Sequence, residues 1–255
     1  MASYSTLAEW EAAQGGGDGA EVLFDLDCAA LGAADWKGEA AVTIGGKSWT
    51  LYNSSDCGAF GPDGSTGIVC TPTTGKYWHV GAAACPAMFC PLSTLDASVS
   101  DTARYTMIMQ IPSWSVDQQG ATGYGQLMIG WWTTGNLNRY YSAMFGPAPS
   151  NNLFAFEGYN TWYTNGSATT ERSFAVDLGR GGANLCYTHT AATTDYASMT
   201  ARFGMGNNGT TVGSLGSASV LLPSAAAAGA YFSGRQAAGT VIYTVSRITV
   251  IKWPT

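Results

Sequence analysis

Residues 104–157 contain four alternating segments, which read RYTMIMQI (104–111), QLMIGWW (126–132), YYSAMF (140–145) and LFAFE (153–157). In the first of them Tyr105, Met107 and Met109 share one parity, and Thr106 and Gln110 share the other. Successive side chains of a strand point to opposite faces, so this period of two predicts strands with one buried face. We predict that the four segments form the middle of an antiparallel sheet, with partners supplied by the two ends of the chain.

Short segments of the same kind flank this stretch on both sides and are separated by Gly, Pro and Asn turns. We predict strands over 21–27, 40–44, 48–52, 68–70, 174–178, 184–188, 198–205, 219–222 and 240–253. The pair Gly45-Gly46 supplies the positive φ angles of a tight hairpin turn. Roughly a dozen short strands with almost no helix predict an all-β protein, built as an antiparallel β-sandwich.

Several segments have a weaker pattern. We predict loops over 53–75 around the strand at 68–70, a short helical turn over 91–96, a turn over 160–170, and a helical turn or tight loop over 225–228. In the closing segment the parity changes at Ser246-Arg247. Either a β-bulge or burial of both faces would explain that change.

The start of the chain predicts an arm that is separate from the sandwich. Residues 5–13 (STLAEWEAA) begin with hydroxyl side chains that can cap a helix, and Glu9 follows in the first turn. The glycines of 15–19 (GGGDG) form a flexible hinge. We therefore predict a short helical arm over 1–19 and a single domain over 20–255. A frayed terminus is the alternative.

Composition excludes several functional classes. Hydrophobic residues make up 46% of the 255 residues and charged residues only 11%, with a net charge of −6. The absence of a basic run argues against nucleic-acid binding. No apolar run approaches the ~20 residues that span a bilayer. No secretory signal is visible at the start, so we expect synthesis in a cytoplasm or prior removal of a signal.

Two terminal segments resemble a known family. They are VLFDLD (22–27) followed by VTIGGKSWTL (42–51), and YFSG (231–234) followed by VIYTVSRITVIKW (241–253). This layout resembles the concanavalin A-like, laminin G-like jelly rolls of phage and other virion proteins. The resemblance implies two packed, curved antiparallel sheets, with the final strand beside the first. It also implies capsid decoration or a tail or fibre head, and in many members glycan binding.

Aromatic side chains carry the clearest functional signal. The chain has 9 Trp and 13 Tyr, several of them adjacent in sequence. Neighbouring residues of a strand point to opposite faces, so either Trp131 or Trp132 must leave the core side. Stacking on a sugar ring, contact with another subunit and core packing all remain open. The candidate glycan- or partner-binding residues are Trp131, Trp132, Tyr159, Trp162 and Tyr163.

Carboxylates offer two further candidates. Glu157 and Glu171 could face each other across a hairpin, as the two carboxylates of a glycosidase do. Asp25 and Asp27 share one strand face and are weak candidates for a Ca²⁺ site. Solvated surface charges are the alternative in both cases. We predict no cofactor and no resident metal.

The six cysteines permit disulfides, and the local candidate pairs are Cys57 with Cys70 and Cys85 with Cys90. Buried free thiols are the alternative, because Cys packs as a small hydrophobic residue.

These observations support three functional hypotheses. The first is a non-enzymatic phage structural protein, made in the host cytoplasm and assembled as a homo-oligomer with other virion proteins, which also engages host-surface glycans. The second is a free, extracellular carbohydrate-binding module, and the third is a glycan hydrolase or lyase that uses Glu157 and Glu171.

Overall fold

The part of the protein that the structure describes is an antiparallel β-sandwich with almost no helix. A computed structural model describes residues 21–73, 85–111, 114–116, 126–134, 140–145, 152–157, 161–167, 172–179, 186–189, 222–233 and 241–253. The arm predicted over 1–19 and the strand predicted over 198–205 lie outside these residues. All strand pairs found among them are antiparallel. Among them, too, no helix is both long and apolar enough to cross a membrane.

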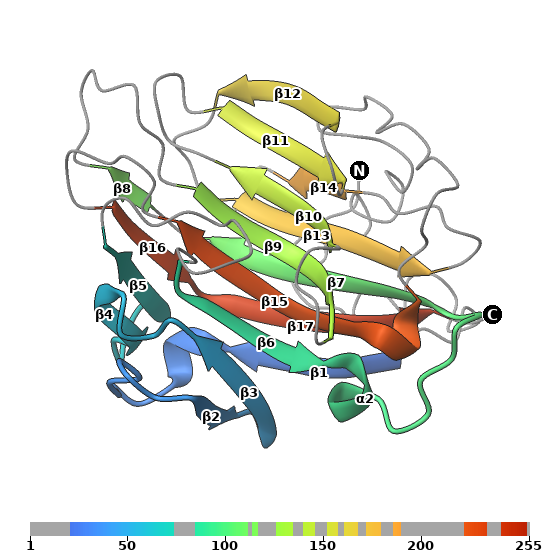
Figure 1. Ribbon diagram of the computed structural model, residues 1–255, viewed down its shortest axis with the longest axis horizontal. Helices are drawn as coiled ribbons and strands as arrows, with labels where there is room; N and C mark the ends of the chain where they lie inside the picture. The colour runs from blue at the N-terminus through green and yellow to red at the C-terminus, as the bar shows by residue number, and fades with distance from the viewer. Residues whose placement is uncertain are drawn as a thin grey trace.

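Three sheets make up the described architecture (Figure 1). The five-stranded sheet has the order β1 (Glu21–Asp27), β17 (Arg247–Trp253), β7 (Arg104–Ile111), β13 (Arg172–Gly179) and β14 (Cys186–His189). The eight-stranded sheet has the order β12 (Thr161–Ser167), β11 (Asn152–Glu157), β10 (Tyr140–Phe145), β9 (Gln126–Thr133), β15 (Ala226–Ser233), β6 (Ala87–Pro91), β3 (Lys47–Tyr52) and β2 (Ala41–Ile44).

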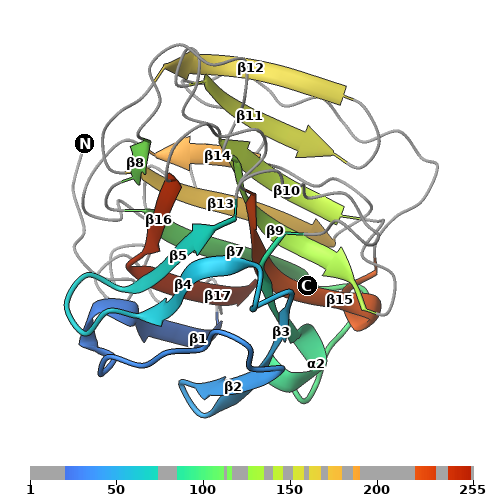
Figure 2. The same cartoon turned by 60° about the vertical axis from the view of Figure 1, so that its left-hand side comes forward.

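The third sheet is smaller and is drawn at one side of the molecule in Figure 2. Its order is β4 (Cys57–Pro62), β5 (Ile68–Pro72), β16 (Val241–Val245) and β8 (Trp114–Val116). The remaining short elements are the 3₁₀ turns η1 (Cys28–Ala30) and η3 (Pro223–Ala225) and the helical turn α2 (Leu92–Leu95).

The ends of the described chain lie side by side, as the sequence predicts. β1 pairs along its length with β17, from Glu21 opposite Lys252 to Asp27 opposite Arg247. On the outward face Asp25 accepts two hydrogen bonds from the Arg247 guanidinium, at 2.8 and 2.5 Å, and a third from the Thr249 hydroxyl at 2.9 Å. A bidentate arginine–carboxylate pair of this kind holds the register of two strands.

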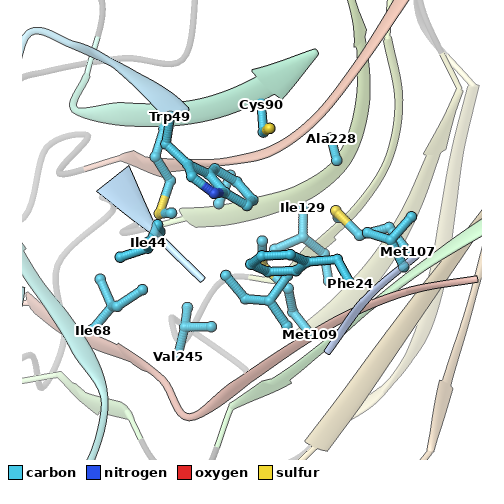
Figure 3. Packing of buried hydrophobic residues seen from close by; sticks show 14 of the residues in the cluster. Phe24, Ile44, Trp49, Ile68, Cys90, Met107, Met109, Ile129, Ala228 and Val245 are labelled. Atoms are coloured by element: carbon cyan, nitrogen blue, oxygen red, sulfur yellow. The ribbon is translucent and has the colours of Figure 1, made fainter. Parts of the chain in front are cut away.

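One core cluster is formed by buried residues from all three sheets (Figure 3). Phe24 of β1 packs against Trp49 of β3, with ring centroids 5.8 Å apart. Met107 and Met109 of β7 face the same interior, as their alternation predicts. The Gly45-Gly46 hairpin is also confirmed, with φ angles of 56° and 72°.

The central stretch is divided between two layers, which corrects the prediction of one sheet. β9, β10 and β11 are neighbours in the eight-stranded sheet, whereas β7 lies between β17 and β13 in the five-stranded sheet. Alternation reports which face of a strand is buried but not which sheet it joins. The chain between β7 and β9 includes β8 of the four-stranded sheet, so it does not pass directly from one of these strands to the other.

The parity change at Ser246 marks a break between two strands. β16 belongs to the four-stranded sheet and β17 to the five-stranded sheet. Ser246 donates its backbone N–H to Gln110 O at 2.9 Å and accepts from Cys28 N at 2.8 Å. Both faces of β17 are buried, with Ile248 and Val250 on one side and Thr249 and Ile251 on the other. Burial of both faces is therefore confirmed, and a strand break replaces the bulge.

Three weak segments of the sequence form strands instead of turns or loops. β12 replaces the turn predicted over 160–170, and β4 lies in the segment predicted as a loop. β15 begins at Ala226, where a helical turn or tight loop was one prediction, and η3 precedes it. The helical turn predicted over 91–96 is confirmed as α2.

Asp96 directly follows α2, and its side chain contacts residues of both β7 and β17. Its buried carboxylate accepts from the Tyr105 hydroxyl at 2.9 Å and from the backbone N–H of Ser98 at 2.8 Å. Lys252 Nζ lies 2.8 Å from the same carboxylate. Burial raises the pKa of Asp96, but the hydrogen bonds from Lys252, Ser98 and Tyr105 outweigh it and lower the pKa to about 2.

Asp96→Asn should destabilise the fold in a pH-dependent way. A carboxyl whose folded-state pKa lies below its ordinary value of 3.8 stabilises the fold above that value, and this contribution disappears as the pH falls towards 2. We expect the variant to lose roughly 2 kcal/mol of unfolding free energy at pH 7. Urea unfolding of both proteins from pH 7 to pH 2 measures the difference.

The matched control is Asp35→Asn, because Asp35 is exposed and accepts a local backbone hydrogen bond from Lys37. The unfolding free energy of this control should stay close to that of the wild type from pH 7 to pH 2. A stability difference for Asp96→Asn that is constant from pH 7 to pH 2 would show that its charge is not what stabilises the fold.

Candidate functional site

The outward face of the eight-stranded sheet carries four aromatic side chains in mutual contact. We call Tyr52, Phe89, Trp132 and Tyr231 the outer aromatic cluster. The Phe89 ring is central, with its centroid 5.0 Å from Trp132, 5.1 Å from Tyr231 and 5.7 Å from Tyr52. The ring centroids of Trp132 and Tyr231 are 5.3 Å apart. The tilted and edge-to-face arrangements are those that aromatic pairs prefer.

Strand parity places these residues opposite the core. On β9, Leu127, Ile129 and Trp131 belong to the core between the sheets. Trp132 therefore points outward, and the prediction that one of the two tryptophans leaves the core side is confirmed. Trp131 is fully buried in the core and Trp132 is only 1% exposed on the opposite face, so neither predicted binding residue is accessible to a ligand in this structure.

Two glycines make room for the cluster on the neighbouring strands. Gly229 of β15 lies opposite Phe89 of β6 on one side and opposite Gly130 of β9 on the other. A Cβ at Gly229 would lie 2.2 Å from Phe89 Cδ1 and 2.2 Å from the Met88 carbonyl oxygen. The Phe89 ring therefore covers a backbone that has no side chain, which is the close approach that glycine permits.

The cluster is buried at its centre and open at one edge. Phe89, Trp132 and Tyr231 are each at most 3% exposed, whereas Tyr52 is 39% exposed. Tyr52 ends β3, and the next outward residues on β3 and on the edge strand β2 are small, and three of the four are polar. The exposed members of this strip on β2 and β3 are Ala41, Thr43, Ser48 and Thr50.

The described part of this face is electrically neutral. The outward positions that the structure describes on β2, β3, β6 and β15 are Ala41, Thr43, Ser48, Thr50, Tyr52, Ala87, Phe89, Pro91, Ala227, Gly229 and Tyr231. None of these is charged. We call the exposed edge formed by Tyr52, Thr50, Ser48 and Thr43 the tyrosine-hydroxyl strip. It offers one aromatic face and four hydroxyl groups, each able to donate and accept hydrogen bonds.

The other sequence candidates are only partly placed. Trp162 and Tyr163 lie on β12, at the far edge of the same sheet from Tyr52, but the structure does not describe their side chains. Tyr159 and Glu171 lie outside the described residues. Glu157 ends β11, again without a described side chain, so the carboxylate pair stays a prediction.

The Ca²⁺ candidates have other roles. Asp25 is paired with Arg247 and Thr249, and these contacts lower its pKa despite the opposing effect of burial. Asp27 accepts the Ala29 N–H at 3.0 Å and caps η1. Within the described part of the chain, no group of His, Cys, Asp and Glu side chains could hold a metal ion.

The five described cysteines are buried free thiols: Cys28, Cys57, Cys70, Cys85 and Cys90. Cys90 faces the core from β6, and Cys85 lies just before that strand. Residues five apart along an extended chain are separated by about 16 Å. The Cα atoms of a disulfide lie within about 7 Å, the segment Ala87–Cys90 is extended in β6, and both thiols are free in this structure.

Sequence reasoning found Trp132 but missed its partners. Phe89 and Tyr231 lie in Ala-rich segments with little strand signal, and more than 100 residues separate them along the chain. Their contact arises because β15 lies between β6 and β9. An adjacent pair of aromatic residues is visible in one sequence, whereas this long-range strand order is not.

Comparisons with known proteins do not assign a family. No protein-family model matches the sequence, and no curated protein matches it either. Solved structures with some likeness include the CBM2 module of the evolved Dit of Lactobacillus casei BL23 phage J-1, with a TM-score of 0.49 and 12% identity over 92% of this chain and 97% of that one.

Two further solved structures also have some likeness to this chain. The metal-free carbohydrate recognition domain of Emp46p has a TM-score of 0.43 and 8% identity over 89% of this chain and 95% of that one. Trypanosoma rangeli sialidase has a TM-score of 0.44 and 11% identity over 80% of this chain, which spans only 27% of the sialidase chain. Likenesses at this level do not carry a functional argument.

Gly229→Ala should disrupt the outer aromatic cluster. The new methyl group would meet the Met88 backbone carbonyl, which cannot move without disturbing strand pairing, and the Phe89 ring, which cannot move without disturbing its aromatic contacts. We expect a loss of about 1–3 kcal/mol in unfolding free energy and a changed near-UV circular dichroism spectrum.

Gly32→Ala is the matched control, because nothing lies within 4 Å of a Cβ built there. Its stability and its aromatic spectrum should match the wild type. If Gly229→Ala behaved like this control, the close packing of Phe89 on the Gly229 backbone would be refuted.

Proposed function

We propose that this chain is a non-enzymatic, carbohydrate-binding β-sandwich that serves as a structural component of a phage particle. The observation that carries the binding proposal is Tyr52, an aromatic side chain that is 39% exposed at the edge of a rigid, buried aromatic cluster. The tyrosine-hydroxyl strip beside it supplies polar groups.

Sugars combine an apolar ring face with a rim of hydroxyl groups. An exposed aromatic ring can stack on the apolar face, and neighbouring polar groups can meet the hydroxyls. Phe89 packs edge-on against Tyr52 and limits its movement, so little side-chain freedom remains to be lost on binding. Thr50 and Ser48 lie on the same face of the same strand as Tyr52.

Binding fits the described face better than hydrolysis. Glycoside hydrolysis requires two carboxyl groups about 5–10 Å apart. The described outward positions around Tyr52 are uncharged, and the candidates Glu157 and Glu171 belong to other parts of the chain. We therefore favour carbohydrate binding over glycoside hydrolysis as the function of this face.

The particle context rests on the sequence resemblance to concanavalin A-like, laminin G-like domains of virion proteins. The pairing of β1 with β17 agrees with the layout that this resemblance implies. We propose that other virion proteins and further copies of this chain are its partners. A free extracellular carbohydrate-binding module is the alternative context.

Tyr52→Ala should weaken glycan binding about tenfold, because it removes the stacking surface. Tyr52→Phe keeps that surface and should retain most of the affinity. A glycan array with the purified protein identifies a ligand, and calorimetry with that ligand measures the three affinities. Val22→Ala is the matched control, since Val22 is similarly exposed on β1 of the other large sheet.

The proposed glycan-binding site would be contradicted if the wild type bound no glycan. It would also be contradicted if Tyr52→Ala bound the identified glycan as tightly as the wild type does. In either case a loss of fold must first be excluded by circular dichroism.

The particle context has its own test. Proteomic analysis of density-gradient-purified particles should recover the chain in a fixed stoichiometric ratio to the coat protein. Recovery only in the particle-free fraction would favour the free module and leave the glycan site to be judged on its own.

A further inference from the structure

The four-stranded sheet holds a pair of thiols on adjacent strands. Cys57 begins β4 and Cys70 lies in the middle of β5. Cys57 is 3% exposed and Cys70 is fully buried, and both belong to the same core cluster. We propose that Cys57 and Cys70 form a peroxide-sensitive dithiol, which closes to a disulfide across the β4–β5 hairpin.

Strand register brings the two residues onto one face. Phe60 lies opposite Cys70, and Cys57 lies opposite Pro72, with a register shift between these pairs. Cys70 and Pro72 are two residues apart, so Cys57 is the diagonal neighbour of Cys70 on the same side of the sheet. A bulge increases the local twist of a strand and alters the approach of diagonal side chains.

Each of the two thiols affects the pKa of the other. Cys57 Sγ also lies 2.8 Å from the backbone oxygen of Ser54, to which it donates. The hydrogen bond from Cys70 lowers the pKa of Cys57 despite the opposing effect of burial, and Lys37 adds to this lowering. Burial and the same contact raise the pKa of Cys70 well above its ordinary value.

This asymmetry assigns different roles to the two sulfurs. The thiolate is the form that reacts with oxidants, so Cys57 is the first to be oxidised and Cys70 resolves the product. Burial raises the pKa of both Cys28 and Cys90 to about 12, which keeps these thiols protonated and unreactive.

The reaction needs hydrogen peroxide as oxidant and balances in two steps. The Cys57 thiolate attacks one peroxide oxygen, the O–O bond breaks, and the products are Cys57 sulfenic acid and hydroxide. The Cys70 sulfur then attacks the Cys57 sulfur, forming the S–S bond and releasing water as the Cys70 proton joins the departing hydroxyl group. The two sulfurs together lose two electrons, and the peroxide accepts them.

Access to Cys57 comes from the edge of the sheet. β4 is the terminal strand of its sheet, and Gly58 and Ala59 beside Cys57 are exposed. Terminal strands open locally more readily than central ones, and peroxide is small enough to enter through such an opening. Closure of the bond would fix the β4–β5 hairpin, which would then resist unfolding better.

The test is oxidation of the intact, folded protein with stoichiometric hydrogen peroxide, followed by denaturation and alkylation of the remaining thiols. Mass spectrometry should find six alkylated cysteines before oxidation and two fewer afterwards, with the peptides of Cys57 and Cys70 linked. The thermal unfolding midpoint of the oxidised protein should rise, and a thiol reductant should return it.

Cys90→Ala is the matched control and should form the same cross-link, whereas Cys70→Ser should instead accumulate oxidised, unlinked Cys57. Retention of all six alkylated thiols would overturn the proposal. So would a cross-link that joins another pair, such as Cys70 and Cys85. Peptide mapping of the wild type decides the outcome even if the Cys70→Ser variant fails to fold.

Discussion

The whole architecture depends on the pairing of the first described strand with the last. β17 lies between β1 and β7, it is buried on both faces, and Arg247 and Thr249 bind Asp25 of β1. The same strand places Lys252 beside Asp96, which joins α2 to the five-stranded sheet. One segment at the end of the chain thus joins β1 to the body of the sandwich.

Ser246 extends this role to the third sheet. The chain leaves β16 in the four-stranded sheet and enters β17 in the five-stranded sheet across this one residue. The backbone bonds of Ser246 to Gln110 and Cys28 hold the crossing in place. The β4–β5 hairpin, with its two thiols, is therefore linked to the sandwich through β16.

β15 has a corresponding role in the eight-stranded sheet, because its first five residues, 226–230, are all Ala or Gly and are small on both faces. Ala228 lies opposite Trp131 on the core side, and Ala227 lies opposite Trp132 on the outward side. This strand allows two adjacent tryptophans to be buried on opposite faces of β9. Together with Gly229 it also accommodates Phe89 and positions the outer aromatic cluster beside the open edge at Tyr52.

Sequence alone predicted the features that depend on local pattern. Alternation located β1, β7, β9, β10 and β11, and the Gly-Gly pair located the β2–β3 hairpin. It missed β15 because Ala and Gly have low strand propensity, and their place there is decided by the large side chains around them. Parity identified Trp132, but the contacts of Phe89 and Tyr231 depend on strand order, which alternation does not report.

The central functional claim is that the edge at Tyr52 contacts a carbohydrate. Backbone NMR chemical shifts, followed while a neutral oligosaccharide is added, test it most directly. The account predicts saturable changes concentrated at Thr43, Ser48, Thr50 and Tyr52, with little change along β1 and β17. Changes concentrated on β1 and β17, or no saturable change for any neutral oligosaccharide, would contradict it.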